Sequence, residues 1–189
     1  MPLNLNYADF SARPVVMEDA EMMLSWRNEP PVREGMFHSR LITLEEQIPW
    51  LRKRLEADDC HYYIFQFQGR PTGVFGIYDI SVEQGVGEWV YFMGPRYPEL
   101  PRGAGAAMEF IAMETFYTTL GLRRVWGRTL KSNARVWQLH QRFGFEIEGV
   151  LREHVVKDGE IIDMLCVGML DREWAARRDA QYADIFAPA

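Results

Sequence analysis

Small residues gather at one point of the chain, in the stretch Arg102-Gly103-Ala104-Gly105-Ala106-Ala107. Two glycines and three alanines leave backbone N–H groups open to a ligand, and a helix N-terminus attracts negative charge. The stretch therefore suits a phosphate or diphosphate group, with Arg102 as a fixed cation beside it. The same residues also suit a tight helix entry with close packing, and the loop alone does not separate the two interpretations.

Two better-known phosphate motifs are excluded by the residues that follow. Met108 stands where a dinucleotide-binding fingerprint has its last glycine, and no Gly-Lys-Ser/Thr sequence marks a Walker loop.

Two titratable side chains lie on either side of this loop in the chain. Glu88 begins a run of strand character, and alternation places it on the same face as Val90 and Phe92. It is either a partly buried carboxylate that accepts a proton or an exposed acid at a strand end. Helical spacing puts His140 on one face with Asn133 and Phe143, so it should point inward. It is either a proton-transfer group or a core histidine bonded to a backbone carbonyl.

The elements that must position these residues do not alternate regularly. Strand character appears at 10–16, 62–67, 72–80, 88–93 and 124–129, and in two short runs, 154–156 and 161–162, around the Asp158-Gly159 turn. Helices are predicted near 17–27, 43–55, 106–120, 133–144 and 173–185. This order predicts an α/β domain with a mixed, partly antiparallel sheet of about seven strands flanked by helices. It is not the order of a doubly wound fold.

Composition narrows the class of protein. A chain of 189 residues without a linker-like stretch fits one domain, 1–189. Its net charge of −6 makes nucleic acid a poor partner. Cys60 and Cys166 lack metal or disulfide spacing, as do the histidines outside the 133–144 helix, so we predict no metal. No signal peptide or apolar run long enough for a membrane span is present, so a cytoplasmic protein is expected.

The loop also fits Arg/Gln-x-x-Gly-x-Gly/Ala, the coenzyme A pyrophosphate pattern of the GNAT acetyltransferase superfamily. The run Trp89–Met93 resembles that family's splayed central strand, whose backbone pairs with the pantetheine arm. The segment 133–145 resembles its second cofactor helix, and the resemblance covers nearly the whole chain. It implies one GNAT domain with splayed central strands that hold acetyl-CoA. Substrate-side elements would lie at 17–80, the coenzyme core at 86–145, and a closing hairpin and helix at 146–189.

The resemblance also implies a set of coenzyme contacts. They are Tyr91, Phe92, Met93, Arg102, Gly103, Ala104, Gly105, Ala106, Ala107, Asn133 and Trp137. Asn133 has a second interpretation, as a side-chain cap of its helix.

The N-terminal half resembles the nucleotide-sugar branch of the family, in particular the PseH-type enzymes of pseudaminic acid synthesis. Those enzymes acetylate the amine of a UDP-linked 4-amino-4,6-dideoxy sugar. The resemblance implies Arg27 as a diphosphate contact, with Glu46 and Tyr78 as further substrate contacts. Plainer roles are a solvated helix end for Arg27, a capping box for Glu46 and ordinary aromatic packing for Tyr78. The branch commonly has a histidine where this chain has Gln47, which leaves the sugar open.

The implied chemistry is direct acetyl transfer to an amine in a ternary complex. His140 stands where many relatives present a tyrosine to the leaving thiolate, and Glu88 is the candidate base. Two alternatives remain open: an acetyltransferase of protein N-termini, and a coenzyme A-binding module without chemistry. Dimers are common in the family and the last helix is a candidate contact, so a homodimer is one expectation.

Overall fold

One open sheet organises the protein. The computed structural model describes residues 6–186, apart from residue 8 and residues 96–98. Within these residues the sheet has eight strands in the order β1-β2-β3-β4-β5-β6-β8-β7. The strands are β1 (Asn6–Tyr7), β2 (Phe10–Pro14), β3 (His61–Phe67), β4 (Arg70–Ser81), β5 (Val86–Met93), β6 (Arg124–Leu130), β7 (Glu146–Lys157) and β8 (Glu160–Leu170). The seven predicted strands are all present, and a two-residue strand is added at one edge.

The pairing of β5 with β6 is short and parallel, whereas every other described pair is antiparallel. It joins Val86 to Arg124, Gly87 to Val125 and Glu88 to Trp126. Beyond Glu88 no further pair joins the two strands in the described structure, although β5 continues to Met93 and β6 to Leu130. The sheet therefore opens at its centre, as the splayed strands of the sequence prediction require.

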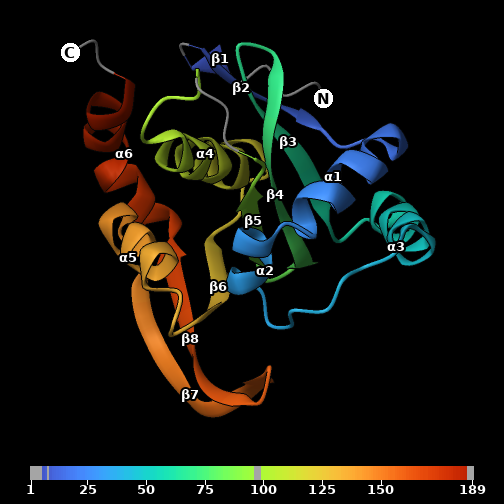
Figure 1. The fold of residues 1–189 in the computed structure, drawn as a ribbon. Helices are drawn as coiled ribbons and strands as arrows, with labels where there is room; N and C mark the ends of the chain where they lie inside the picture. The colour runs from blue at the N-terminus through green and yellow to red at the C-terminus, as the bar shows by residue number, and fades with distance from the viewer. Residues whose placement is uncertain (1–5, 8, 96–98, 187–189) are drawn as a thin grey trace.

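Helices cover both faces of the sheet because its strands are apolar on both sides (Figure 1). Along β3, Tyr63 and Phe65 join one core and Tyr62 and Ile64 the other. The first core packs against α4 (Ala104–Met113), α5 (Ala134–Phe143) and α6 (Asp171–Phe186). The second packs against α1 (Ala20–Arg27) and α3 (Leu44–Glu56). A 3₁₀ turn, η1 (Met17–Asp19), leads into α1.

The long helix predicted after the small-residue loop has two parts. The α-helical part, α4, is followed directly by a π-helical segment, η2 (Glu114–Thr119). Their buried faces include Phe110, Met113 and Tyr117, which recur at helical spacing. Glu114 is also buried, because Tyr7, Trp174 and Arg178 donate hydrogen bonds to its carboxylate. The helix thus ties β1 and α6 to the core through a buried charge.

Two elements differ from the sequence prediction. A helix, α2 (Pro30–Gly35), follows the helix predicted near 17–27 and is not among the predicted helices. Proline has no N–H to lose in a helix's first turn, so Pro30 and Pro31 start this helix as well as ending α1. The C-terminal hairpin is also longer than the short runs around Asp158 predicted, because β7 and β8 extend over 12 and 11 residues. Most of β7 is exposed, which removes the apolar alternation that marks a strand.

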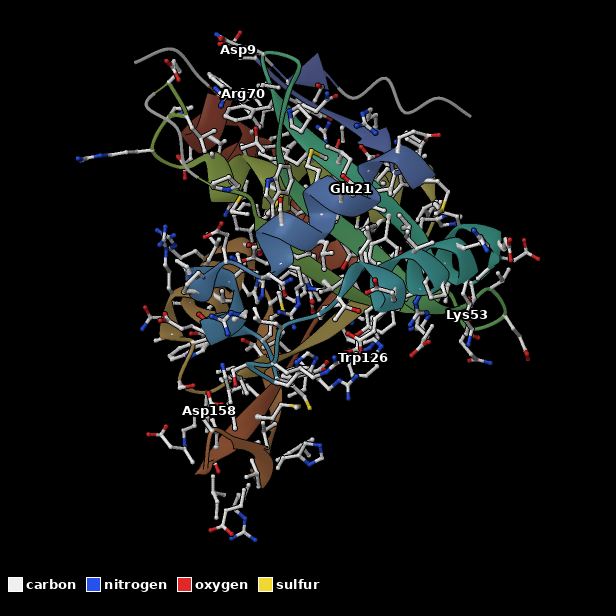
Figure 2. The ribbon with its side chains drawn as sticks, turned by 45° about the vertical axis from the view of Figure 1, so that its right-hand side comes forward. Asp9, Glu21, Lys53, Arg70, Trp126 and Asp158 are labelled. Atoms are coloured by element: carbon white, nitrogen blue, oxygen red, sulfur yellow. The ribbon has the colours of Figure 1, made fainter. Side chains whose placement is uncertain are left out.

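The β7–β8 hairpin reaches past the other strands at the bottom of Figure 1, and Figure 2 labels Asp158 near its end. From there it contacts the N-terminal half of the chain. The Lys157 ammonium donates to the carbonyls of Arg33 (2.9 Å) and Glu34 (2.6 Å), and the Ser39 hydroxyl donates to Asp158. The hairpin, which follows α2 by more than 100 residues in the sequence, therefore holds this helix in place. None of the helices in the described part of the chain is long and apolar enough to cross a membrane.

Candidate active site

A cleft of about 1110 Å³ lies at the opening between β5 and β6. Residues 88–94 of β5 and 127–129 of β6 form its two sides, and residues 103–106, at the start of α4, lie at one end. Further walls come from α5 and from residues 31–37 around α2. The backbone edge of β5 is free along the cleft because its pairing with β6 has ended. A ligand with its own amide groups can therefore bond to β5 as an additional strand would.

The small-residue loop has the properties of an anion site. Gly103 precedes α4 with φ of 93°, in the left-handed region that favours glycine. In the described structure the N–H groups of Gly103 and Gly105 make no hydrogen bond, whereas those of Ala106 and Ala107 bond to Gly103. A Cβ added at Gly105 would meet nothing within 4 Å. Close packing therefore explains buried Ala104 and Ala107 but not Gly105, whose open space and free N–H fit a diphosphate.

His140 lies at the inner wall of the cleft, on the last turn of α5. Its ring is buried and is surrounded by Trp89, Tyr91 and Phe145, with ring centroids 4.9, 5.7 and 5.2 Å away. Its Nδ1 is 2.9 Å from Oε1 of Glu109 on α4, which is buried as well. The predicted core histidine bonded to a backbone carbonyl is therefore not what the structure contains, because the partner of His140 is a carboxylate.

Glu88 lies on the opposite side of the cleft and is buried, not exposed at a strand end. Arg128 of β6 donates two hydrogen bonds to its carboxylate, from Nε at 2.7 Å and Nη2 at 3.0 Å. Burial, followed by the charge of Glu88, raises the pKa of Tyr78 well above its usual value. Both oxygens of Glu88 are thus engaged with the guanidinium of Arg128.

Other predicted site residues divide into those at the cleft and those away from it. Tyr91, Phe92 and Met93 line it along β5, and Gly103, Ala104, Gly105, Ala106, Asn133 and Tyr78 line it elsewhere. Asn133 makes no side-chain cap; its amide nitrogen instead lies 2.9 Å from where a Cβ on Gly35 would be. The capping prediction for this side chain is therefore wrong, and its amide faces the cleft wall near α2.

Five predicted residues lie outside the cleft lining. Arg102 is exposed and Ala107 is buried behind the loop. The Trp137 indole donates to the Lys131 carbonyl at 3.1 Å. Glu46 closes a capping box by accepting from the Thr43 N–H, and Arg40 donates to the same carboxylate at 2.8 Å. Arg27 ends α1 beside the cleft wall, and its Nη1 is buried without a hydrogen-bond partner among the described residues.

Sequence reasoning missed two functional candidates, Arg128 and Glu109. Arg128 lies on β6 across the parallel pair from Glu88, 40 residues later in the chain, and stacks against Phe37 and Trp126. Glu109 interrupts an otherwise apolar face of α4, which is a signal in itself, because a buried acid needs a partner. No group of three or more potential metal ligands occurs in the part of the chain that the structure describes.

Known proteins share this architecture. A family model described as an acetyltransferase (GNAT) domain matches residues 11–146. An uncharacterized SPbeta prophage-derived N-acetyltransferase of Bacillus subtilis (strain 168), YokL, is 23% identical over 125 residues, which are 66% of this chain and 70% of that protein.

Two solved structures are similar in fold. A GCN5-related N-acetyltransferase from Brucella melitensis matches with a TM-score of 0.77 and 25% identity, over 100% of this chain and 86% of its own. The spermidine N-acetyltransferase of Vibrio cholerae, in complex with CoA and spermine, matches with a TM-score of 0.82 and 16% identity, over 89% and 99%. Together with the family match and the splayed, glycine-lined cleft, these likenesses show that the chain belongs to the GNAT acetyltransferase domain family and is an acetyl-CoA-dependent N-acetyltransferase.

Proposed function

We propose that the acceptor is the amine of a small, negatively charged molecule, and specifically the 4-amino group of a UDP-linked amino-deoxy sugar. The observation that carries this proposal is the state of Arg27. Burial and the positive charges of Arg40 and Arg33 lower its pKa, and Nη1 has no partner among the described residues. Arg27 is partly buried, and a buried guanidinium nitrogen without an acceptor is unfavourable for stability. A phosphate group of a bound acceptor would supply the missing negative charge.

The surroundings of Arg27 support an anion at this place. Burial, followed by the positive charges of Arg27, Arg40 and Lys157, lowers the pKa of His38 in the loop after α2. The carboxylate of Glu46 opposes this effect but is already bonded to Arg40. Arg27, Arg40 and Lys157 thus bring positive charge to the segment around His38, which would attract a diphosphate and repel a cation.

A polyamine is the second candidate, because Glu29 and Glu34 line the cleft at α2 and the Vibrio cholerae relative was solved with spermine. Both glutamates are exposed, however, so water and salt screen their charges. Arg27 is partly buried, so its charge is screened less than theirs, and this decides our preference. Acetylation of peptide N-termini and coenzyme binding without chemistry remain the outcomes against which the proposal is tested.

The test is a thiol-release assay with acetyl-CoA and four acceptors: a UDP-4-amino sugar, the corresponding amino sugar without the nucleotide, spermidine and a peptide with a free N-terminus. We expect turnover with the UDP-linked amine at a KM at least tenfold below that of the free amino sugar. Turnover of spermidine or the peptide without the UDP-amine would refute the acceptor proposal. Tight coenzyme binding without thiol release from any acceptor would support the non-catalytic module instead.

A variant connects the assay to the structure. Arg27→Met keeps the length of the side chain and removes its charge. Because a hydrogen bond to a charged group contributes about 1.5–3 kcal/mol, we expect a rise of roughly 10- to 150-fold in KM for the UDP-amine. Arg123→Met is the matched control, since the Arg123 side chain bonds only to the Gln84 carbonyl among the described residues and Arg123 directly precedes β6.

A further inference from the structure

Glu109 is a buried carboxylate that the fold leaves half satisfied. Its Oε1 contacts Nδ1 of His140, but Oε2 is buried without a hydrogen-bond partner in the described structure. The other buried glutamates of this region have donors at both oxygens. Glu88 accepts from Arg128, and Glu114 accepts from Arg178, Trp174 and Tyr7. An incompletely bonded buried acid is unfavourable for stability, so its retention points to function.

The position of the pair connects it with the reaction. His140 lines the cleft whereas Glu109 lies behind it, so Glu109 touches the imidazole and not the cleft itself. Of the two ring nitrogens, Nδ1 is occupied by Glu109, and Nε2 makes no hydrogen bond to the described residues. The charge of Glu109 also reaches the cleft wall: burial first, and then this carboxylate, raises the pKa of Tyr91, which Arg135 opposes.

We propose that Glu109 fixes His140 with its proton on Nδ1, so that Nε2 carries the free electron pair and shuttles the proton of acetyl transfer. The amine nitrogen bonds to the acetyl carbon while the bond from that carbon to sulfur breaks. One proton must then pass from nitrogen to sulfur. Nε2 accepts it from the amine and delivers it to the thiolate, so the products are an amide and a thiol and the imidazole returns to its first state. One residue thus serves as both base and acid.

The net charge of the pair changes during this cycle. While Nε2 is unprotonated the buried Glu109–His140 pair carries one negative charge, and when Nε2 takes up the proton the pair becomes neutral overall. The backbone N–H groups of Gly144 and Phe145 donate to the His140 carbonyl, so the chain around the imidazole is held in place at the end of α5. Glu88, held by Arg128, is not needed as a base in this scheme.

The first test is the tautomer of His140, which needs neither donor nor acceptor. In the ¹⁵N-labelled protein, long-range ¹H–¹⁵N correlation distinguishes Nδ1–H from Nε2–H, and His140→Asn assigns the signal among the four histidines. We expect Nδ1–H in the wild-type protein. In Glu109→Gln the side-chain amide can donate to Nδ1, so the ring should change to Nε2–H, as an amide in place of the carboxylate does in a serine protease triad. A wild-type Nε2–H tautomer would overturn the proposal.

The second test is kinetic, with any acceptor that the thiol-release panel identifies. Glu109→Gln should lower kcat by about 100-fold or more while the Kd of coenzyme A and the KM of the acceptor stay within twofold. Glu109→Asp, which restores the carboxylate, should recover part of kcat. Glu114→Gln is the matched control, because it removes an equally buried carboxylate from the same long helix without touching the cleft, and it should change kcat by less than twofold.

The outcomes separate this inference from the acceptor proposal. It depends on acetyl transfer and not on the UDP group, so a panel that selects another amine leaves both tests in force. A folded Glu109→Gln with kcat within twofold of wild type would refute it. If that variant does not fold, the wild-type tautomer decides alone.

Discussion

Two buried glutamates near the cleft have opposite environments, and the difference assigns them different roles. Glu88 shares a bidentate ion pair with Arg128 at 2.7 and 3.0 Å, whereas the partner of Glu109 is a histidine. The guanidinium holds Glu88 in a fixed ion pair. Glu109 instead orients an imidazole that lines the cleft. Side-chain partners therefore decide which of two similar acids takes part in chemistry.

The ion pair of Glu88 predicts a non-additive effect on stability. Arg128→Met leaves Glu88 buried without its cation, so we expect a loss of about 2–4 kcal/mol in the free energy of unfolding, at the lower end because Arg128 is one-third exposed. Glu88→Gln combined with Arg128→Met should recover at least half of that loss. Urea unfolding of both single variants and the double variant gives the coupling energy. Additive losses would contradict a mutual dependence of the two charges.

The space beside Gly105 predicts the effect of filling it. Gly105→Glu puts a side chain and a negative charge where the diphosphate should dock, so the Kd of acetyl-CoA should rise by at least about 100-fold. Isothermal titration calorimetry measures this directly. Gly149→Glu is the control, because a Cβ there also meets nothing within 4 Å and φ is not positive, but Gly149 lies on β7 away from the loop. Equal affinities of the two variants would mean that the anion site is elsewhere.

The sequence predicts residues of the site better than it predicts their partners. Gly103 and Gly105 are recognisable because main-chain exposure requires small residues within a few positions of each other. The partner of Glu88 is 40 residues away on β6, and that of Glu109 is 31 residues away on α5. Neither pairing leaves a local pattern, since it depends on how β5 meets β6 and how α4 packs against α5. The roles of Glu88 and Glu109 are therefore distinguished by their partners, which only the structure shows.

Among the elements, those with strong local signals agree with prediction. The Thr43–Glu46 capping box starts α3, and the Asp158-Gly159 turn joins β7 to β8. The segments that differ are stabilised by distant contacts. Six residues are enough for α2 because Lys157 from the hairpin binds its C-terminal carbonyls, and the π-helical η2 brings Glu114 to Arg178 on α6. Such contacts are a property of the fold and cannot be read from the segment itself.

The start of α1 predicts a pH-dependent stability. Burial opposes ionisation of Asp19, but the bidentate bond from Arg13, the Val16 N–H and the Arg13 charge outweigh it, so its pKa lies below the ordinary value of 3.8. A lowered pKa means that the charged form stabilises the fold above about pH 4, and that this stabilisation is lost as pH falls through the folded-state pKa.

Asp19→Asn should therefore cost about 1–2 kcal/mol in the free energy of unfolding at pH 7, a modest value because Arg13 is partly exposed. The difference from wild type should shrink between about pH 4 and pH 2. Urea unfolding at several pH values measures it, and Asp58→Asn, on an exposed turn, is the control. A cost that does not change with pH would show that shape, not charge, makes Asp19 important.

For the molecule as a whole, the cleft is a feature of the fold itself, since β5 and β6 part after Glu88. Binding to a site formed in the folded state stabilises that state by about 2.7 kcal/mol at a ligand concentration 100 times Kd. For a domain of this size, that corresponds to a rise in Tm of roughly 5–11 °C. Differential scanning calorimetry with acetyl-CoA measures it, and Gly105→Glu should show almost no rise. A large rise in that variant would place the coenzyme outside the cleft.

The contact between the hairpin and α2 also spans the molecule, because Lys157 joins the C-terminal hairpin to the N-terminal half of the chain. Lys157→Met removes two donors and should loosen α2 without unfolding the sheet. We expect faster amide hydrogen exchange confined to residues 30–36 and a higher KM for the acceptor. Unchanged exchange in this segment would mean that α2 is stable by itself.

The parting of β5 from β6 also bears on solubility. A strand with unbonded N–H and C=O groups at a sheet margin tends to recruit a strand from another molecule, which is how many β-rich proteins precipitate. In this protein the unpaired margin lines a cleft with walls from α2, α4 and α5, so a strand from another molecule would have to enter between these helices. A slender thioester arm has none of a strand's side chains. The unpaired edge of β5 is therefore accessible to the thioester donor and less accessible to strands of other molecules.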